Sequence, residues 1–154
     1  MSTFTLDQVG SIFTDAMIDV LATSTGLDFV VSSDDSDIEL NDMVSFLSLY
    51  GENNGMLFIS ASEKVSLTLC AQMTGTKASE IIKSDIDDAL CELTNMVAGN
   101  AKLRFNNAGT VYTLSPLFLV RGSNMSITSK KRVTLVSRQL VCDKMSIKLK
   151  VVFF

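Results

Sequence analysis

Apolar residues recur at helical spacing in three stretches of the chain. Over residues 5–22 they fall at every third or fourth position with the aspartates off that face, which predicts an amphipathic helix. A second helix is expected to follow the capping-box pattern Ser60-Ala-Ser-Glu63 and to end at Gly75. A third and longer helix is predicted over about residues 84–106.

Strand-like patterns occupy most of the remaining sequence. Val44–Tyr50 and Met56–Ser60 flank a turn at Gly51–Gly55 and predict a hairpin. A short strand is expected at Phe29–Val31. After Gly109 the apolar residues alternate or form short runs, which predicts a strand-rich half made of Val111–Leu114, Leu117–Arg121, Met125–Thr128, Arg132–Cys142 and Met145–Phe154.

The order of these elements favours one fold class. Asp143-Lys144 is predicted to be a tight turn between the last two strands, and Pro116 is expected at a sheet edge or bulge, where a missing N–H is tolerated. Helices and strands do not alternate as βαβ units, so we expect an α+β fold of two layers, with three helices and a largely antiparallel sheet. At 154 residues, the chain is predicted to form a single domain over residues 1–154.

Polar residues form a stripe along one side of the third predicted helix. At about 100° per residue, Asp88, Glu92, Asn95, Gly99 and Lys102 fall within about 80° of one another. The opposite side is wide and apolar, as a helix that covers a core requires, and it comprises Ile86, Ala89, Leu90, Leu93, Met96, Val97 and Ala101. The stripe is therefore expected to face outward.

The pattern alone leaves two interpretations of this stripe open. Gly99 costs a helix about 1 kcal/mol relative to alanine, and it removes side-chain bulk one turn beyond Asn95, where a partner could approach. Alternatively, the polar members are ordinary solvated surface residues and the glycine serves helix packing. Periodicity by itself favours this second, simpler interpretation.

The composition excludes several kinds of catalytic site. The chain has no histidine, which removes histidine metal ligands, histidine general bases and nucleophiles activated by histidine. Cys70, Cys91 and Cys142 lie far apart within apolar patterns, which suits buried reduced thiols better than disulfides or a metal cluster. The acidic run Ser32–Glu39 permits a Mg²⁺ or Ca²⁺ site, but it lacks the EF-hand spacing, which favours a solvated loop. No glycine-rich nucleotide loop follows a candidate strand, so we expect neither a cofactor nor a metal.

Charge is distributed unevenly along the chain, whose net charge is −4. Residues 1–120 carry 5 basic and 16 acidic side chains, a net charge of −11, whereas residues 121–154 carry 8 basic and 1 acidic, a net charge of +7. A basic segment can bind nucleic acid, but these cations are spaced along alternating strands without interleaved aromatic residues, which favours solvent-facing strand lysines. The apolar runs are too short to span a bilayer and no secretory signal is visible. We therefore expect a cytoplasmic protein with neither nucleic-acid nor membrane partners.

The stripe, within Glu92-Leu-Thr-Asn95-Met-Val-Ala-Gly99, resembles the signature of the CheC, CheX and FliY family of chemotaxis phosphatases. That signature reads (Asp/Ser)-x-x-x-Glu-x-x-Asn with a downstream proline, and Asp88 and Pro116 complete it here. The predicted elements also follow the order and length of the CheX-like members, which carry the motif once. The first predicted helix reads Thr14-Asp-Ala-Met-Ile-Asp19 and has neither glutamate nor asparagine at the equivalent spacing, so one copy of the site is expected.

The resemblance implies a phosphatase for the aspartyl phosphate of a CheY-like receiver domain, which would bring its own Mg²⁺. By this likeness, Asn95 would orient the attacking water and Glu92 would hold the receiver's active-site lysine. Gly99 would let the partner come close, while Asp88 and Lys102 would edge the contact. The resemblance further implies a homodimer that joins its sheets edge to edge.

Two functions of another class stay open at this stage. The same helix could serve a non-catalytic adaptor that binds a phosphorylated receiver, or a regulatory partner of a receptor-modifying deamidase. The sequence does not identify the receiver, and it assigns no definite role to the acidic loop at residues 34–42.

Overall fold

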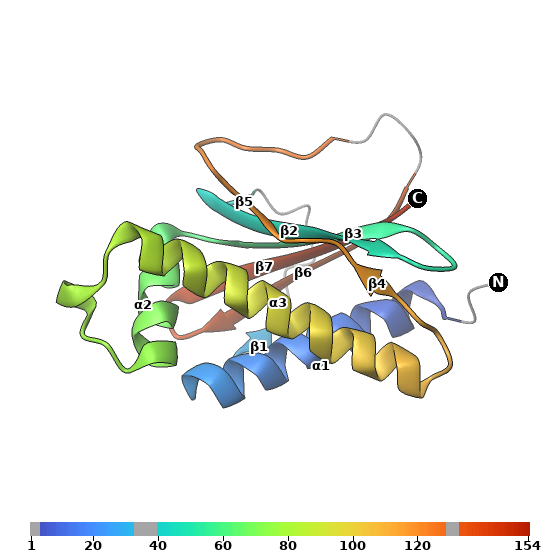
Figure 1. The fold of residues 1–154 in the computed structure, drawn as a ribbon, viewed down its shortest axis with the longest axis horizontal. Coiled ribbons are helices and arrows are strands. Elements are labelled where there is room, and N and C mark those ends of the chain that lie inside the picture. The colour runs from blue at the N-terminus through green and yellow to red at the C-terminus, as the bar shows by residue number, and fades with distance from the viewer. Residues whose placement is uncertain (1–3, 33–39, 129–132) are drawn as a thin grey trace.

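The computed structural model describes residues 4–32, 40–128 and 133–154. Within these ranges, the helices cover one face of a seven-stranded antiparallel sheet (Figure 1), which confirms the predicted α+β class with three helices. The helices are α1 (Leu6–Thr25), α2 (Glu63–Thr74) and α3 (Lys83–Asn107), with a short 3₁₀ turn η1 (Ala78–Glu80) before α3. The strands are β1 (Val30–Val31), β2 (Met43–Tyr50), β3 (Gly55–Ala61), β4 (Thr113–Leu114), β5 (Phe118–Arg121), β6 (Thr134–Cys142) and β7 (Met145–Phe153). None of these helices combines the length and apolar character that a bilayer crossing requires.

The sheet runs in the order β1-β6-β7-β3-β2-β4, and β5 also pairs with β2. The two short strands β4 and β5 share the outer edge of β2, where Leu49 pairs with Leu114 and Phe46 with Phe118. Pro116 lies in the break between them, as predicted for a residue that cannot donate to a ladder.

Both predicted hairpins are present. Leu49 pairs with Gly55 at the end of the β2–β3 hairpin, and a Cβ on this glycine would lie 2.5 Å from the Val152 carbonyl oxygen. Glycine is therefore required there by the neighbouring strand. Asp143 turns the chain between β6 and β7 with a left-handed φ of 52°, a conformation that aspartate tolerates better than most residues.

Strand β7 shows where the basic side chains of the C-terminal part lie. Ile147, Leu149 and Val151 are fully buried under the helices. Lys148 and Lys150 alternate with them and therefore face the other side of the sheet, opposite Ser60 and Phe58 of β3. Strand alternation therefore explains why these two lysines occur between buried residues, as the sequence pattern indicated.

The N-cap of α2 differs from the prediction. Ser62 caps the helix, and its Oγ accepts a hydrogen bond from the Val65 N–H at 3.1 Å. Ser60 lies in β3 instead, where its hydroxyl accepts from the Asn41 N–H and donates to the Met43 carbonyl. The capping-box assignment was wrong by two residues because the sheet uses the first serine and leaves the second for the helix.

A second correction concerns the segment after β5. Met125–Thr128 was predicted as a strand, but it has no regular secondary structure, and Ile127 is 45% exposed. Alternation alone does not make a strand without a neighbour to pair with, and β4 and β5 already occupy the free edge of β2. Arg132, the predicted start of β6, lies outside the described residues, as do residues 33–39 of the acidic run.

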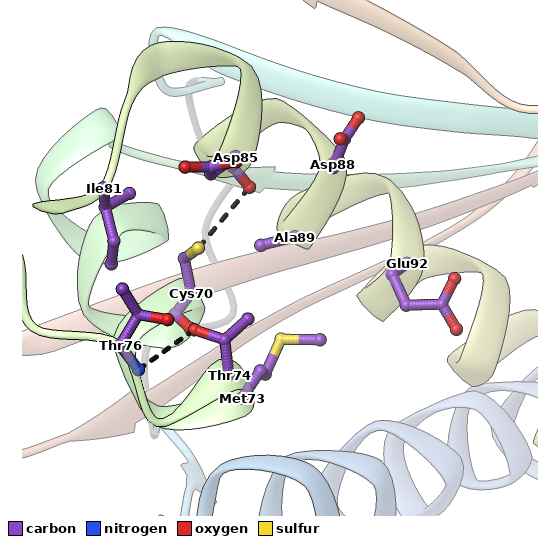
Figure 2. A pocket seen from close by; sticks show the side chains of 9 residues that line it. All are labelled: Cys70, Met73, Thr74, Thr76, Ile81, Asp85, Asp88, Ala89 and Glu92. Carbon is purple, nitrogen blue, oxygen red and sulfur yellow. Dashed lines mark hydrogen bonds between the residues drawn. The ribbon is translucent and has the colours of Figure 1, made fainter.

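Cys70, in the second half of α2, contacts the first turn of α3 (Figure 2). The Cys70 thiol donates a hydrogen bond to the Asp85 carbonyl oxygen at 3.5 Å. Asp85 lies in the first turn of α3, and its carboxylate accepts a hydrogen bond from the N–H of the N-cap residue Ile82 at 3.0 Å. The three cysteines are free thiols, of which Cys70 is buried, whereas Cys91 and Cys142 are half-buried. The hydrogen bond from Cys70 thus links the first turn of α3 to α2.

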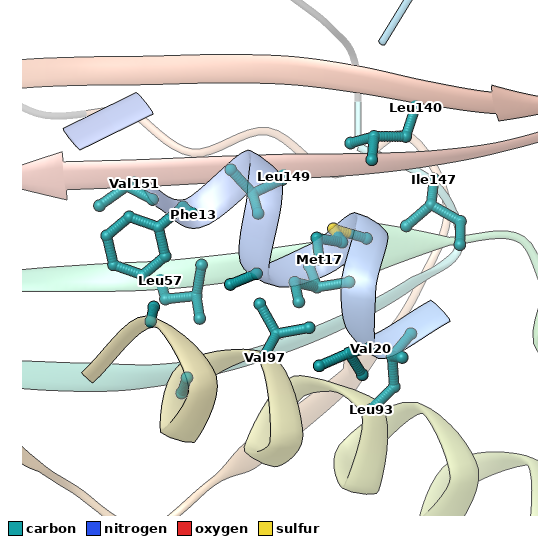
Figure 3. Close-up of a cluster of buried hydrophobic side chains, with 14 of the residues drawn as sticks. Phe13, Met17, Val20, Leu57, Leu93, Val97, Leu140, Ile147, Leu149 and Val151 are labelled. Atoms are coloured by element: carbon teal, nitrogen blue, oxygen red, sulfur yellow. The ribbon is translucent and has the colours of Figure 1, made fainter. Parts of the chain in front are cut away.

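The core lies between the sheet and the two long helices (Figure 3). Met17 of α1 and Leu93 and Val97 of α3 are fully buried, and they face Leu57 and Leu149 from the sheet. Each large apolar side chain buried in this way contributes about 1.5–3 kcal/mol. This packing fixes the rotation of α3 about its own axis and therefore determines which of its residues face outward.

Candidate functional site

The five stripe residues share one outward face of α3. Asp88, Glu92, Asn95 and Gly99 are exposed, and Lys102 is half-buried. The face is set by the apolar residues of the same helix, which are buried as predicted except for the half-buried Met96. The structure therefore brings the residues together, and their individual roles remain predictions.

Two acidic residues at the start of α3 are used by the fold. The Arg121 Nε of β5 donates to the Asp87 carboxylate at 2.7 Å, and the same guanidinium lies 3.5 Å from Glu63 at the start of α2. Asp85 caps α3 through the Ile82 N–H. The contacts of Arg121 connect α3 to β5 and to the start of α2.

The carboxylates of the stripe are not used in this way. Within the described part of the chain, neither Asp88 nor Glu92 makes an ion pair or a side-chain hydrogen bond, and the Asn95 amide has no hydrogen-bond partner. Glu92 and Asn95 lie three positions apart on one helix face, where side chains are neighbours. An unpaired carboxylate and an unpaired amide are thus presented together to solvent.

Gly99 lies beside them in open space. A Cβ built at this glycine meets no atom within 4 Å, leaving aside its own helix backbone. The interpretation that this glycine serves helix packing is therefore wrong among the described residues. The position leaves the α3 backbone accessible from outside, one turn beyond Asn95.

A hollow of about 450 Å³ lies beside the stripe, between the C-terminal end of α2 and the N-terminal half of α3 (Figure 2). Asp85, Asp88 and Glu92 are the acidic residues among those that line it. The remaining lining comes from Cys70, Met73, Thr74, Thr76, Ile81 and Ala89. The sequence does not predict this hollow, because its two walls come from separate helices and neither wall has a distinctive residue pattern.

The thiol in this hollow is not a nucleophile. Burial raises the pKa of Cys70, and the nearby Asp85 carboxylate raises it further, so the thiol stays protonated at neutral pH. The described residues also contain no group of three or more side chains that could hold a metal ion. The site offers an amide that can donate and accept hydrogen bonds and a carboxylate that can hold a cation.

Comparison with known families gives a match over residues 43–139 to the family described as chemotaxis phosphatase CheX. The matched range contains all of α3 and more than half of the chain. The chain belongs to the CheX family. Comparison with curated proteins gave no match.

Solved structures of CheX proteins share the whole fold. The chemotaxis protein CheX from Vibrio vulnificus aligns with a TM-score of 0.84 at 19% identity, over 99% of this chain and 100% of that chain. A CheX in complex with CheY, BeF₃ and Mg²⁺ from Borrelia burgdorferi aligns with a TM-score of 0.75 at 18% identity, over 93% and 96%. The middle domain of FliM from Vibrio alginolyticus is less similar, with a TM-score of 0.60 at 16% identity, over 96% and 91%. At these identities the likeness establishes the fold.

Proposed function

We propose that this protein hydrolyses the aspartyl phosphate of a CheY-like receiver domain. The observation that carries the proposal is the unpaired, exposed pair Glu92 and Asn95 on the outward face of α3, in a chain of the CheX family. The Borrelia burgdorferi CheX of the same fold was crystallised with CheY, BeF₃ and Mg²⁺, which supports a receiver as the partner.

The reaction suits a protein without its own nucleophile or metal. Water attacks phosphorus, the bond between phosphorus and the aspartyl oxygen breaks, and the carboxylate leaves with the bonding electrons. Of the two water protons, one stays on the released phosphate and the other passes to solvent. The receiver's Mg²⁺ and lysine neutralise phosphoryl charge, so the phosphatase has only to place the water in line with the leaving group.

The Asn95 amide is suited to that placement. Its oxygen accepts a hydrogen bond from the water while its NH₂ donates to a phosphoryl oxygen, and it is too weak a base to take the proton. Glu92, one turn earlier, holds the receiver's lysine in a charge-assisted hydrogen bond. Asp88 and Lys102 edge the contact, and Gly99 gives the partner close access to the helix.

The deciding experiment follows phosphate loss from a phosphorylated CheY-like receiver with and without this protein. Acceleration that is proportional to the amount of protein, and that is lost with Asn95→Ala, supports the proposal. Binding of the phosphorylated receiver without faster hydrolysis would instead identify an adaptor. Co-purification with a receptor-modifying deamidase would point to the regulatory alternative.

We further propose that the protein forms a homodimer by pairing sheet edges. Among the described residues, β1 pairs with β6 only at Val141 and Leu140, and the Ser32 N–H adds one bond to the Gln139 carbonyl. The earlier half of β6 therefore has an edge that no described strand pairs with, and such edges are suited to a second copy. A monomer in light scattering at micromolar concentration would contradict this.

A further inference from the structure

We propose that the hollow between α2 and α3 receives a lysine or arginine side chain of the receiver, as a second point of attachment beside the Glu92 contact. The identity of the partner rests on the function proposed above. The chemistry of the occupant, however, follows from the hollow itself.

The walls of the hollow favour a cation with a long aliphatic stem. Met73, Ile81 and Ala89 supply apolar surface. Asp88 and Glu92 also line the hollow, and no residue in the described part of the chain neutralises their carboxylates. Lysine and arginine bury their methylene stems on apolar surface and keep the charged head in a polar setting. A hollow of about 450 Å³ accommodates such a side chain together with water.

The end of α2 independently adds negative potential. The hollow lies at the C-terminal end of this helix, where Met73 and Thr74 form part of its lining. A helix C-terminus carries roughly half a negative charge, which lysine or arginine in the last turn commonly offsets. The last turn of α2 has no basic residue, and no lysine or arginine lines the hollow. No described residue that lines the hollow supplies this cation, so we assign it to a partner.

The position of the hollow makes the receiver that partner. Asp88 and Glu92 line it and also belong to the outward stripe, so a protein docked over Asn95 necessarily passes beside it. A basic side chain inserted here would fix the rotation of the receiver about the Glu92 contact. A second fixed point of this kind contributes to partner choice, because a receiver with a neutral or acidic residue at that position leaves the carboxylates unpaired.

The test uses two variants that remove the hollow's preference for cations by different routes. Asp88→Lys reverses one charge, and Thr74→Arg places a cation in the hollow from the end of α2, where the helix dipole favours it and folding should be kept. Glu80→Lys is the control matched to Asp88→Lys, because it reverses a charge in the same way, and Glu80 is exposed in the neighbouring η1 and does not line the hollow.

The readouts are the Kd for a receiver activated with BeF₃ and Mg²⁺, and the KM and kcat for loss of phosphate. Both hollow variants should raise Kd and KM about tenfold, the size expected for a charged hydrogen bond. For Thr74→Arg, kcat should stay within about twofold, because this change leaves every residue of the α3 stripe intact. Glu80→Lys should change Kd by less than about twofold, as screened surface charges do. A receiver in which one surface lysine or arginine is changed to glutamate should lose affinity for the wild-type protein and regain it with Asp88→Lys.

The outcomes separate this inference from the proposed function. Equal Kd values for Asp88→Lys, Thr74→Arg and Glu80→Lys would overturn the hollow as a docking site even if hydrolysis is fast. Tight binding that depends on the hollow, without any hydrolysis, would overturn the phosphatase and keep the docking site. Absence of binding by the wild-type protein would overturn both.

Discussion

The two long helices of this protein lie side by side on the same face of the sheet, yet their glycines have opposite explanations. A Cβ on Gly10 of α1 would lie 2.9 Å from the Arg138 guanidinium and 3.2 Å from the Val136 side chain, both on β6. Gly10 therefore lets α1 approach the sheet. A Cβ on Gly99 of α3 would meet no other part of the chain, so the fold gives no reason for that glycine.

Outward polar residues of the molecule also differ in whether the fold gives them a partner. Asp19 of α1 forms an ion pair with Arg104 of α3, whose Nε also donates to Asn100 at 2.7 Å. Glu92 and Asn95 of α3 have no such partner in the described part of the chain. Polar residues that pair within the protein have a structural explanation. Those that lie together on one surface without such a pair are the better candidates for contact with a partner.

Asn95→Ala should have the largest effect on activity. Loss of the amide should reduce receiver dephosphorylation by about 100-fold or more, because misplacing the attacking water by about 1 Å costs that much. Binding of the receiver should be largely kept, since the carboxylates and Gly99 remain. Single-turnover phosphate release and an equilibrium binding assay measure the two effects separately. Asp15→Ala, an exposed polar residue of α1, is the control and should change neither.

Glu92→Ala should have the next largest effect. It removes the carboxylate that would hold the receiver's lysine, so we expect about tenfold weaker binding of the activated receiver together with slower hydrolysis. Titration of the BeF₃-activated receiver and a phosphate-release assay with this variant measure both quantities. An unchanged Kd would show that Glu92 is a solvated charge like any other on the helix surface.

The outward face of α3 could be predicted because helix amphipathicity is local. The spacing of Leu93 and Val97 against Glu92 and Asn95 fixes which residues share a face, whatever the rest of the chain does. The sheet then buries the apolar side, and the face predicted from the sequence is the face observed. The hairpin turns at Gly55 and Asp143 could be predicted for the same reason.

Features that depend on distant segments could not be predicted in this way. Ser62 caps α2 in place of Ser60, because the Ser60 hydroxyl is hydrogen-bonded to the backbone of Asn41 and Met43, which are distant in the chain. The alternating segment Met125–Thr128 has no strand to pair with. The hollow beside Asp88 needs α2 to pack against α3, and no residue spacing within either helix encodes that contact.

The two helical glycines offer the next test. Gly10→Ala should stabilise the protein less than Gly99→Ala or destabilise it, because the added methyl displaces the Arg138 guanidinium and presses on Val136, which offsets the gain in helix propensity. Gly99→Ala should raise the free energy of unfolding by about 0.5–1 kcal/mol, since alanine is the better helix former and nothing obstructs it. Urea unfolding measures both values. A destabilising Gly99→Ala would show that the fold requires this glycine after all.

A bulky side chain extends the same test from stability to docking. Gly99→Phe places a ring on the open face of α3, so it should weaken binding of the activated receiver while leaving the protein folded. Calorimetric titration of the activated receiver into the variant and into the wild-type protein measures the loss of affinity. Gly99→Ala serves as the matched control, because it changes the backbone preference in the same direction with little added bulk. Equal affinity for all three proteins would place the partner's contact elsewhere.

The smallest effect should come from the ion pair that links α1 to α3. The side chains of Asp19 and Arg104 are 57% and 35% exposed, so water and salt screen their attraction. Asp19→Asn should therefore cost no more than about 0.5 kcal/mol of unfolding free energy, less at high salt, with hydrolysis unchanged. Thermal unfolding at low and high ionic strength, beside the phosphate-release assay, measures this. If Asp19→Asn slowed hydrolysis while stability held, the surface of α1 would belong to the functional site, and the contrast between the two helices would no longer separate residues that serve the fold from those that serve a partner.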